Sequence, residues 1–193
     1  MSRTVTRLFD SRIHAEAAIR DLEAAGFDTG RLSLIASETR SEERRSFSGD
    51  RDGDNETLEG AGEGAATGGV IGAGVGLLAG LGALAVPGLG PVLVAGWLGT
   101  TLAGAATGAA VGGVTGGILG ALKDAGVNDE DAHVYAEGVR RGGALVSVRV
   151  DDADAMRADE ILARHGGSDA SSRGQLYRSE GWTRFDESAG ANI

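Results

Sequence analysis

The acidic segment around residue 50 carries the side chains best suited to binding a cation. Asp50, Asp52 and Asp54 alternate as the first ligands of a calcium-binding loop do. An EF-hand loop counted from Asp50 requires glycine at its sixth position and glutamate at its twelfth, whereas this chain has Asn55 and Ala61 there. The pattern therefore favours a solvated acidic linker, and we expect no metal ligands in it.

Two other patterns suggest chemistry at first sight. The run GAGVG at residues 72–76 lacks the G-x-G-x-x-G spacing and the preceding strand of a dinucleotide-binding loop. His14, His133 and His165 fall on three different expected helices, without the paired spacing of a zinc-binding helix. The chain has no cysteine, which removes thiolate chemistry and cysteine-ligated zinc. We therefore expect no catalytic, cofactor-binding or metal-binding residues, and a protein that is not an enzyme.

The basic pair Arg140 and Arg141 is the remaining candidate for binding. It stands directly before Gly142 and Gly143, where a helix is expected to end. Such a pair could meet an anion or a phospholipid head group. Cations are also favoured at a helix C-terminus for electrostatic reasons alone, which explains the pair equally well.

The strongest pattern in the chain is structural. Residues 65–122 contain no charged side chain, although the whole chain is 24% charged, and glycine recurs there at every fourth position. Columns of this kind let helices approach each other closely. We therefore predict two glycine-zipper helices that pack in a homo-oligomer. The two series are Gly60, Gly64, Gly68, Gly72, Gly76 and Gly80, then Gly104, Gly108, Gly112, Gly116 and Gly120.

A turn and a membrane location follow from the same run. The motif PGLGP, with Pro87, Gly88, Gly90 and Pro91, is expected to turn the two helices into a hairpin. Residues 65–86 would form a helix of about 33 Å, enough to cross a hydrocarbon core of about 30 Å. The nearest cations all lie outside the turn, so we expect a bacterial inner-membrane hairpin with both termini cytoplasmic. The alternative is a soluble cytoplasmic oligomer with its hairpins buried in a central bundle.

The segments flanking this run predict a folded α+β unit. Residues 1–37 read as strand, helix and strand, and residues 126–175 as a helix followed by a second β-α-β unit. The fold class we predict is a split ferredoxin-like βαβ/βαβ domain with helices on one face and a long Gly/Ala-rich helical hairpin inserted. Its fourth strand, residues 168–174, is a weak one. The hairpin would occupy residues 63–125, an acidic polar linker residues 38–62, and a polar and aromatic tail residues 176–193.

These features resemble one bacterial family. The resemblance is carried by the strand–helix–strand unit with AGF, the polar linker and glycine-zipper hairpin that follow it, the stretch DAHVYAEGVRRGGALVSVRVDDADAMRADEILARHGG and the closing YRSEGWTRFD. These features are similar to those of heat-induced general stress proteins (YflT-like). The resemblance implies a stress-linked, non-enzymatic role. A ligand-sensing ferredoxin-like module is a further alternative, based on fold analogy alone.

The overall charge limits which classes of partner we expect. The 193-residue chain has a formal net charge of −10 and no long basic run. This composition argues against a general nucleic-acid binder, because phosphate contacts require lysine and arginine. The expected partners are the chain itself and a lipid bilayer, with no nucleic acid.

Overall fold

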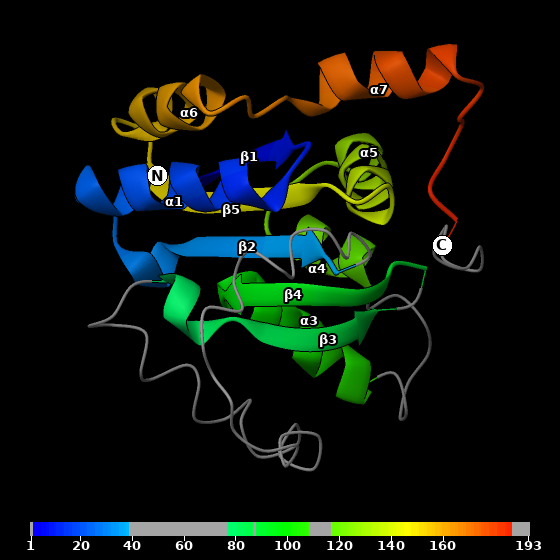
Figure 1. Ribbon diagram of the computed structural model, residues 1–193, viewed down its shortest axis with the longest axis horizontal. Coiled ribbons are helices and arrows are strands. Elements are labelled where there is room, and N and C mark those ends of the chain that lie inside the picture. Colours follow the sequence, from blue (N-terminus) through cyan, green and yellow to red (C-terminus); the bar gives the residue numbers. More distant parts are fainter. Residues whose placement is uncertain (1, 39–76, 87, 109–116, 187–193) are drawn as a thin grey trace.

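The computed structural model describes residues 2–38, 77–86, 88–108 and 117–186. These residues form a mixed α+β fold with a five-stranded antiparallel sheet and six α-helices (Figure 1). The elements in chain order are β1 (Ser2–Phe9), α1 (Arg12–Ala24), η1 (Thr29–Arg31), β2 (Leu32–Ser37), η3 (Leu77–Gly80), β3 (Gly82–Val86), β4 (Gly90–Gly96), α3 (Trp97–Gly108), α4 (Ile118–Asp124), α5 (Asp129–Arg140), β5 (Ala144–Asp151), α6 (Ala155–Arg164) and α7 (Ala170–Ser179).

The strand order places segments from opposite ends of the chain side by side. The order is β1-β5-β2-β4-β3, so β5 lies between β1 and β2 and is antiparallel to both. Thr6 faces Ser147 across the β1–β5 pair, and Ser147 faces Ser33 across the β5–β2 pair. The first and second flanks are therefore joined in one sheet, as the α+β prediction requires.

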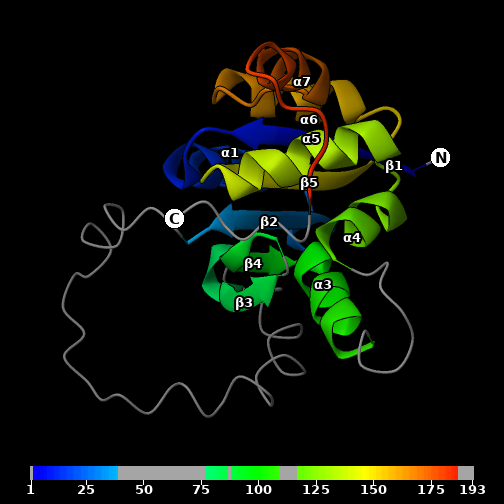
Figure 2. The same ribbon diagram turned by 90° about the vertical axis from the view of Figure 1, so that its right-hand side faces the viewer.

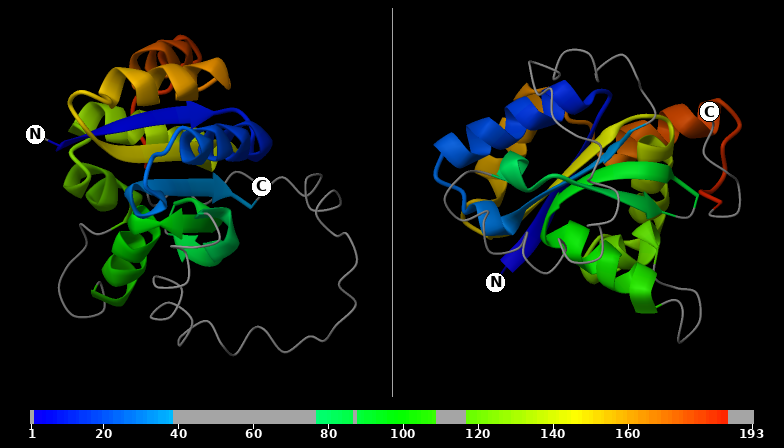
Figure 3. Two further views of the ribbon diagram at one scale, coloured as in Figure 1. Left: turned by 90° about the vertical axis from the view of Figure 1, so that its left-hand side faces the viewer. Right: turned by 60° about the horizontal axis from the view of Figure 1, so that its bottom comes forward.

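Helices cover both faces of the sheet, not one face as predicted. The helices α1 and α6 pack on one face over a core that includes Phe9, Ile19 and Leu162. On the opposite face α3, α4 and α5 pack over a second core that includes Leu8 and Ile35. Figure 3 shows α1 on one side of the sheet and α3 and α4 on the other. The strands serve both cores because alternate side chains of a strand point to opposite faces.

The helix ends of the flanks follow local sequence signals. Ser11 caps α1 and Asn128 caps α5, each accepting a hydrogen bond from a backbone N–H of the first turn. The helix α6 begins at Ala155 after the N-cap Asp154. Gly26 follows α1 with a φ of 89°, a left-handed conformation that glycine adopts without strain.

The predicted helical hairpin is wrong over residues 82–96. This segment forms β3 and β4, which pair with each other and extend the sheet, because β4 also pairs with β2. Gly88 belongs to the connection between the two strands and Gly90 is the first residue of β4, so the predicted turn is present but joins strands. Pro91 lies in β4, and Pro87 lies outside the described residues. The pairing with β2 gives this glycine-rich segment backbone partners that no local signal specifies.

The single helix predicted over residues 92–122 is also wrong. After β4 the chain forms α3 and then α4, two helices that contact each other (Figure 2). Gly104 and Gly108 lie in α3, Gly120 lies in α4, and Gly80 lies in η3. The other members of the two columns, Gly60, Gly64, Gly68, Gly72, Gly76, Gly112 and Gly116, lie outside the described residues.

None of the helices that the structure describes combines enough length with enough apolar character to cross a bilayer.

Candidate functional site

The free edge of β1 is the most distinctive polar surface of the described residues. Among the described residues, the bridge between Leu8 and Ser168 is the only backbone pairing on this edge: Leu8 N–H donates to Ser168 O at 2.9 Å, and Ser168 N–H donates to Leu8 O at 2.8 Å. The weak fourth strand predicted over residues 168–174 is thus reduced to one residue. Asp169 then caps α7, which carries the chain away from the sheet edge.

The Leu8 bridge identifies which backbone groups of β1 face outward. In an antiparallel ladder, the N–H and C=O of one residue point to the same side, and the side alternates with each residue. Because Leu8 faces outward, Thr6 and Thr4 also present their N–H and C=O to the open edge. Val5 and Arg7, between them, face β5. The edge therefore presents a short row of backbone donors and acceptors.

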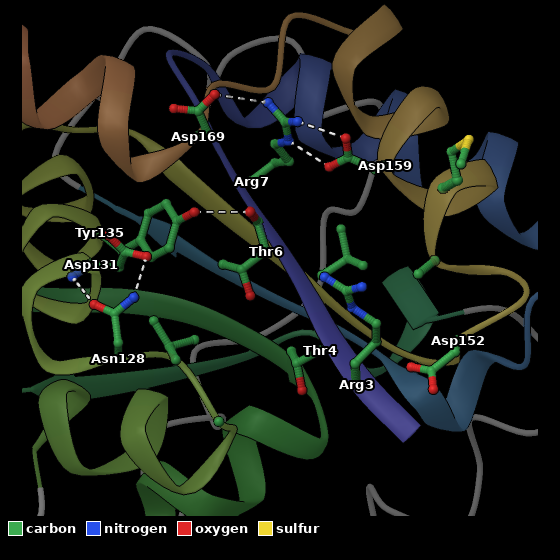
Figure 4. Close-up of a pocket in the computed structure, with 15 residues that line it drawn as sticks. Arg3, Thr4, Thr6, Arg7, Asn128, Asp131, Tyr135, Asp152, Asp159 and Asp169 are labelled. Carbon is green, nitrogen blue, oxygen red and sulfur yellow. Dashed lines mark hydrogen bonds and ion pairs between the residues drawn. The ribbon is translucent and has the colours of Figure 1, made fainter. Parts of the chain in front are cut away.

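This edge forms the floor of an open groove of about 480 Å³. Figure 4 shows Asn128, Asp131 and Tyr135 on the α5 side of β1 and Asp159 on the opposite side, with Arg7 between Asp159 and Asp169. Thr4 and Thr6 lie towards the first wall, whereas Arg3 and Arg7 lie towards the second. Met156 of α6 also lines the groove and is 74% exposed. The row of outward-facing backbone groups therefore lies between these two walls.

Arg7 joins β1 to the α6 side of the groove. Its guanidinium donates to both carboxylate oxygens of Asp159, from Nε at 2.8 Å and from Nη2 at 2.7 Å, and lies 3.6 Å from Asp169. The paired carboxylate of Asp159 raises the pKa of Arg7, against the opposing effect of burial. Hydrogen bonding from Ser172, together with the charge of Arg7, lowers the pKa of Asp169. Both shifts favour the ionised forms of Arg7 and Asp169.

Tyr135 joins β1 to the opposite wall. Its hydroxyl donates to the outward-facing Thr6 C=O at 2.9 Å. Burial raises the pKa of this phenol, with the nearby Asp131 acting in the same direction. The carbonyl of Thr6 retains a second lone pair, so this contact leaves it able to accept another hydrogen bond.

A smaller hollow of about 190 Å³ lies between α5 and the tail. Arg184 donates from Nε to Nε2 of the buried His133 at 2.9 Å. Tyr177 and Trp182 make an edge-to-face contact with ring centroids 5.8 Å apart, and Phe185 is buried. The described part of the tail therefore packs on the domain.

The remaining sequence candidates occupy structural positions. Arg140 and Arg141 both donate to the buried carboxylate of Glu137, at 2.7–2.8 Å, and this pairing explains the two cations without a ligand. His14, His133 and His165 lie at α1, α5 and the C-cap of α6, as expected. Asp50, Asp52, Asp54 and residues 72–76 lie outside the described residues. In the part of the chain that the structure describes, no cluster of three or more acidic or histidine side chains is placed to hold a metal ion.

Sequence reasoning missed the groove. Its charged contacts join distant residues, such as Arg7 and Asp159, and its hydrogen bond from Tyr135 to Thr6 joins two elements with no shared motif. One signal was available, namely the poor strand character of residues 168–174, which leaves β1 without a full neighbour.

Comparisons with protein-family models, with curated proteins and with solved structures gave no match. The resemblance to general stress proteins therefore stays a prediction.

Proposed function

We propose that this protein is a non-enzymatic association protein that takes up an extended polypeptide segment as an added strand on β1. The observation that supports the proposal is the outward row of Thr4 and Thr6 backbone groups on the groove floor. Strand addition of this kind obtains affinity from main-chain hydrogen bonds and specificity from the side chains of the walls.

Exposed strand edges are normally protected, because they pair with other chains. Here β1 has eight residues, contains no proline, and is paired on its outer edge only at Leu8 among the described residues. The two walls flank this edge along the groove. The edge is therefore suited to controlled pairing with one segment.

We propose that β1, β2 and β5, with α1 and α6 on one face, form a ferredoxin-like core in which Ser168 is the remnant of the fourth strand. The β1–β5–β2 order and the antiparallel Leu8–Ser168 bridge support this assignment. In that arrangement the groove is the position that a complete fourth strand occupies.

The test uses amide signals of the full-length chain labelled with ¹⁵N. An end-capped peptide of alternating threonine and valine is titrated, and we expect the Thr4 and Thr6 amides to shift and to exchange with solvent more slowly. Thr6→Pro removes one outward N–H and leaves the β5 ladder intact, since proline is tolerated on edge strands. We expect it to abolish the effect, whereas Thr6→Val should retain it.

An unchanged exchange rate of both amides at saturating peptide contradicts strand addition. If Thr6→Pro alone loses the amide dispersion of a folded protein while Thr6→Val keeps it, the proline has disrupted the fold itself.

Self-association through the glycine columns is a second proposal. Gly104 and Gly108 lie four residues apart and share one face of α3, the spacing that permits close helix contact. We expect Gly108→Leu to lower the oligomer mass in sedimentation velocity, whereas Val75→Leu should not. An unchanged mass for Gly108→Leu contradicts this role.

The stress-linked role and the membrane association are proposed on sequence alone. If the uncharged run inserts in a bilayer, carbonate-washed bacterial membranes retain the full chain and lose a variant without residues 63–124. Complete recovery of the full chain in the soluble fraction overturns the membrane proposal and favours the soluble oligomer.

A further inference from the structure

The charge and shape of the groove indicate which kind of segment it accepts. We propose that the added strand belongs to a partner protein, runs antiparallel to β1, and alternates basic and apolar side chains. This inference rests on the proposed strand addition, and it specifies the chemistry of the partner.

The groove carries an excess of negative charge. Its lining includes four aspartates and two arginines; Arg7 pairs with Asp159 on the α6 side, whereas Asp131 is the carboxylate on the α5 side. A basic segment complements this surface, whereas an acidic segment is repelled by it.

The Leu8–Ser168 bridge indicates the direction of the added strand. Leu8 and Ser168 pair antiparallel, and the outward residues Thr6 and Thr4 come next along the same edge. A strand that continues this ladder in line with Ser168 is antiparallel to β1 and forms hydrogen-bonded pairs with Thr6 and Thr4. The chain itself leaves this course at Asp169, where α7 begins.

The two walls assign side chains to positions on the partner. Residues that pair with Thr6 and Thr4 point to the α5 side, where Asp131 lies, because paired residues share a face of the sheet. The residue between them faces Val5 on the α6 side, next to Ala155 and the exposed Met156. The expected sequence is therefore basic, apolar, basic.

A second copy of this chain fits less well than such a partner. In a two-fold pairing centred on Val5, Arg3 of each copy lies opposite Arg7 of the other. Like charges directly opposite each other destabilise a strand pair. In the same pairing, the residues of the second copy that lie opposite Thr4 and Thr6 are threonines. A threonine side chain carries no positive charge to pair with Asp131.

The experiment measures binding of three labelled, end-capped peptides to the full-length chain by fluorescence anisotropy. They are a five-residue lysine–valine alternation beginning with lysine, its glutamate counterpart and the neutral threonine–valine peptide. We expect the lysine peptide to bind at least about fivefold more tightly than the neutral one, with the glutamate peptide weakest. Added salt should reduce the difference.

Three variants separate groove binding from general attraction to an acidic protein. We expect Thr6→Pro, which changes no charge, to weaken the lysine peptide about tenfold or more. Asp131→Asn should weaken it about three- to fivefold, while the control Glu160→Gln, on the exposed face of α6 and outside the groove lining, should leave it unchanged. Thermal unfolding confirms that each variant is folded.

The outcomes distinguish this inference from the proposed function. Equal binding of the lysine and neutral peptides, both lost in Thr6→Pro, overturns the basic preference and leaves strand addition standing. Binding that Thr6→Pro and Asp131→Asn leave unchanged overturns the inference, because the attraction is then general. Absence of binding by every peptide, with unchanged Thr4 and Thr6 amides, contradicts both proposals. A dimer that Thr6→Pro dissociates, with these amides protected before any peptide is added, identifies a second copy as the occupant and overturns the inference.

Discussion

Leu8 and Ser168 exchange both of their backbone hydrogen bonds, and the pairing stops there. The reason lies in the next residue. Asp169 accepts a hydrogen bond from the Ser172 N–H at 2.7 Å, and this N-cap starts α7 one residue after the bridge. The competition between a strand and a capped helix thus leaves the β1 edge open.

The N-cap of α7 is expected to contribute to stability. Asp169→Ala should lower the free energy of unfolding by about 1 kcal/mol, measured by urea denaturation at pH 7. The folded-state pKa of Asp169 is lowered, so its stabilisation is present above the ordinary pKa of 3.8 and is lost as pH falls below it. The difference between the parent and the variant should therefore shrink at pH 3. Ser171→Ala, an exposed neighbour, is the control, and equal losses for both contradict the capping role.

The hydroxyl of Tyr135 is expected to stabilise the sheet edge. Tyr135→Phe removes its bond to Thr6 C=O and should cost about 1 kcal/mol in chemical denaturation at pH 7. Burial raises the folded-state pKa of this phenol above its ordinary value of 10.0. Its stabilising effect is therefore complete below pH 10 and declines as pH rises beyond it, because the unfolded chain ionises first. The phenylalanine variant should lose less stability between pH 9 and pH 11 than the parent does. If the parent and Tyr135→Phe lose the same stability between pH 9 and pH 11, the ionisation of Tyr135 is not the cause of the loss.

The buried carboxylate of Glu137 is expected to contribute more to the free energy of unfolding than an exposed carboxylate does. Its side chain is fully buried and binds Arg140 and Arg141. Glu137→Gln removes the carboxylate that binds Arg140 and leaves Arg141 with its pair to Glu180, and it should cost about 3 kcal/mol in chemical denaturation. The control is Glu130→Gln, on the same helix, which removes an exposed pair with Arg178 and should cost less than about 1 kcal/mol. Similar costs for the two variants contradict the buried network.

Two glycines test whether residues 82–96 form strands. Gly96 ends β4 with a φ of 77°, and an added Cβ lies 2.1 Å from the Leu32 carbonyl oxygen. Gly96→Ala should therefore cost about 3 kcal/mol or more in thermal unfolding, through backbone strain and overpacking. Gly82, at the edge in β3, has open space around an added Cβ, so Gly82→Ala should change stability by less than about 1 kcal/mol. A tolerated Gly96→Ala contradicts this strand arrangement.

The flanking elements were predictable because their signals are local. Ser11 and Asn128 accept hydrogen bonds within their own first turns, and Gly26 supplies the left-handed residue after α1. The alternation of β5 likewise specifies a strand. Such interactions join residues close in sequence, so a short window contains both partners.

The strands β3 and β4 were not predictable in the same way. Glycine, alanine and valine at residues 82–96 suit either a close-packed helix or a strand, and only the free edge of β2 decides between them. The groove depends on tertiary structure to the same degree. Arg7 meets Asp159, and Tyr135 meets Thr6, only after the sheet has brought distant segments together.

The sequence alone determined the α+β class, the flanking helices and strands, and the weakness of the fourth strand. The tertiary structure decided that the helices cover both faces of the sheet, that residues 82–96 extend it, and that the β1 edge lies between two polar walls. The physical reason is the range of the interactions. Capping and alternation act within a few residues, whereas strand pairing and charge contacts depend on which segments the folded chain places side by side.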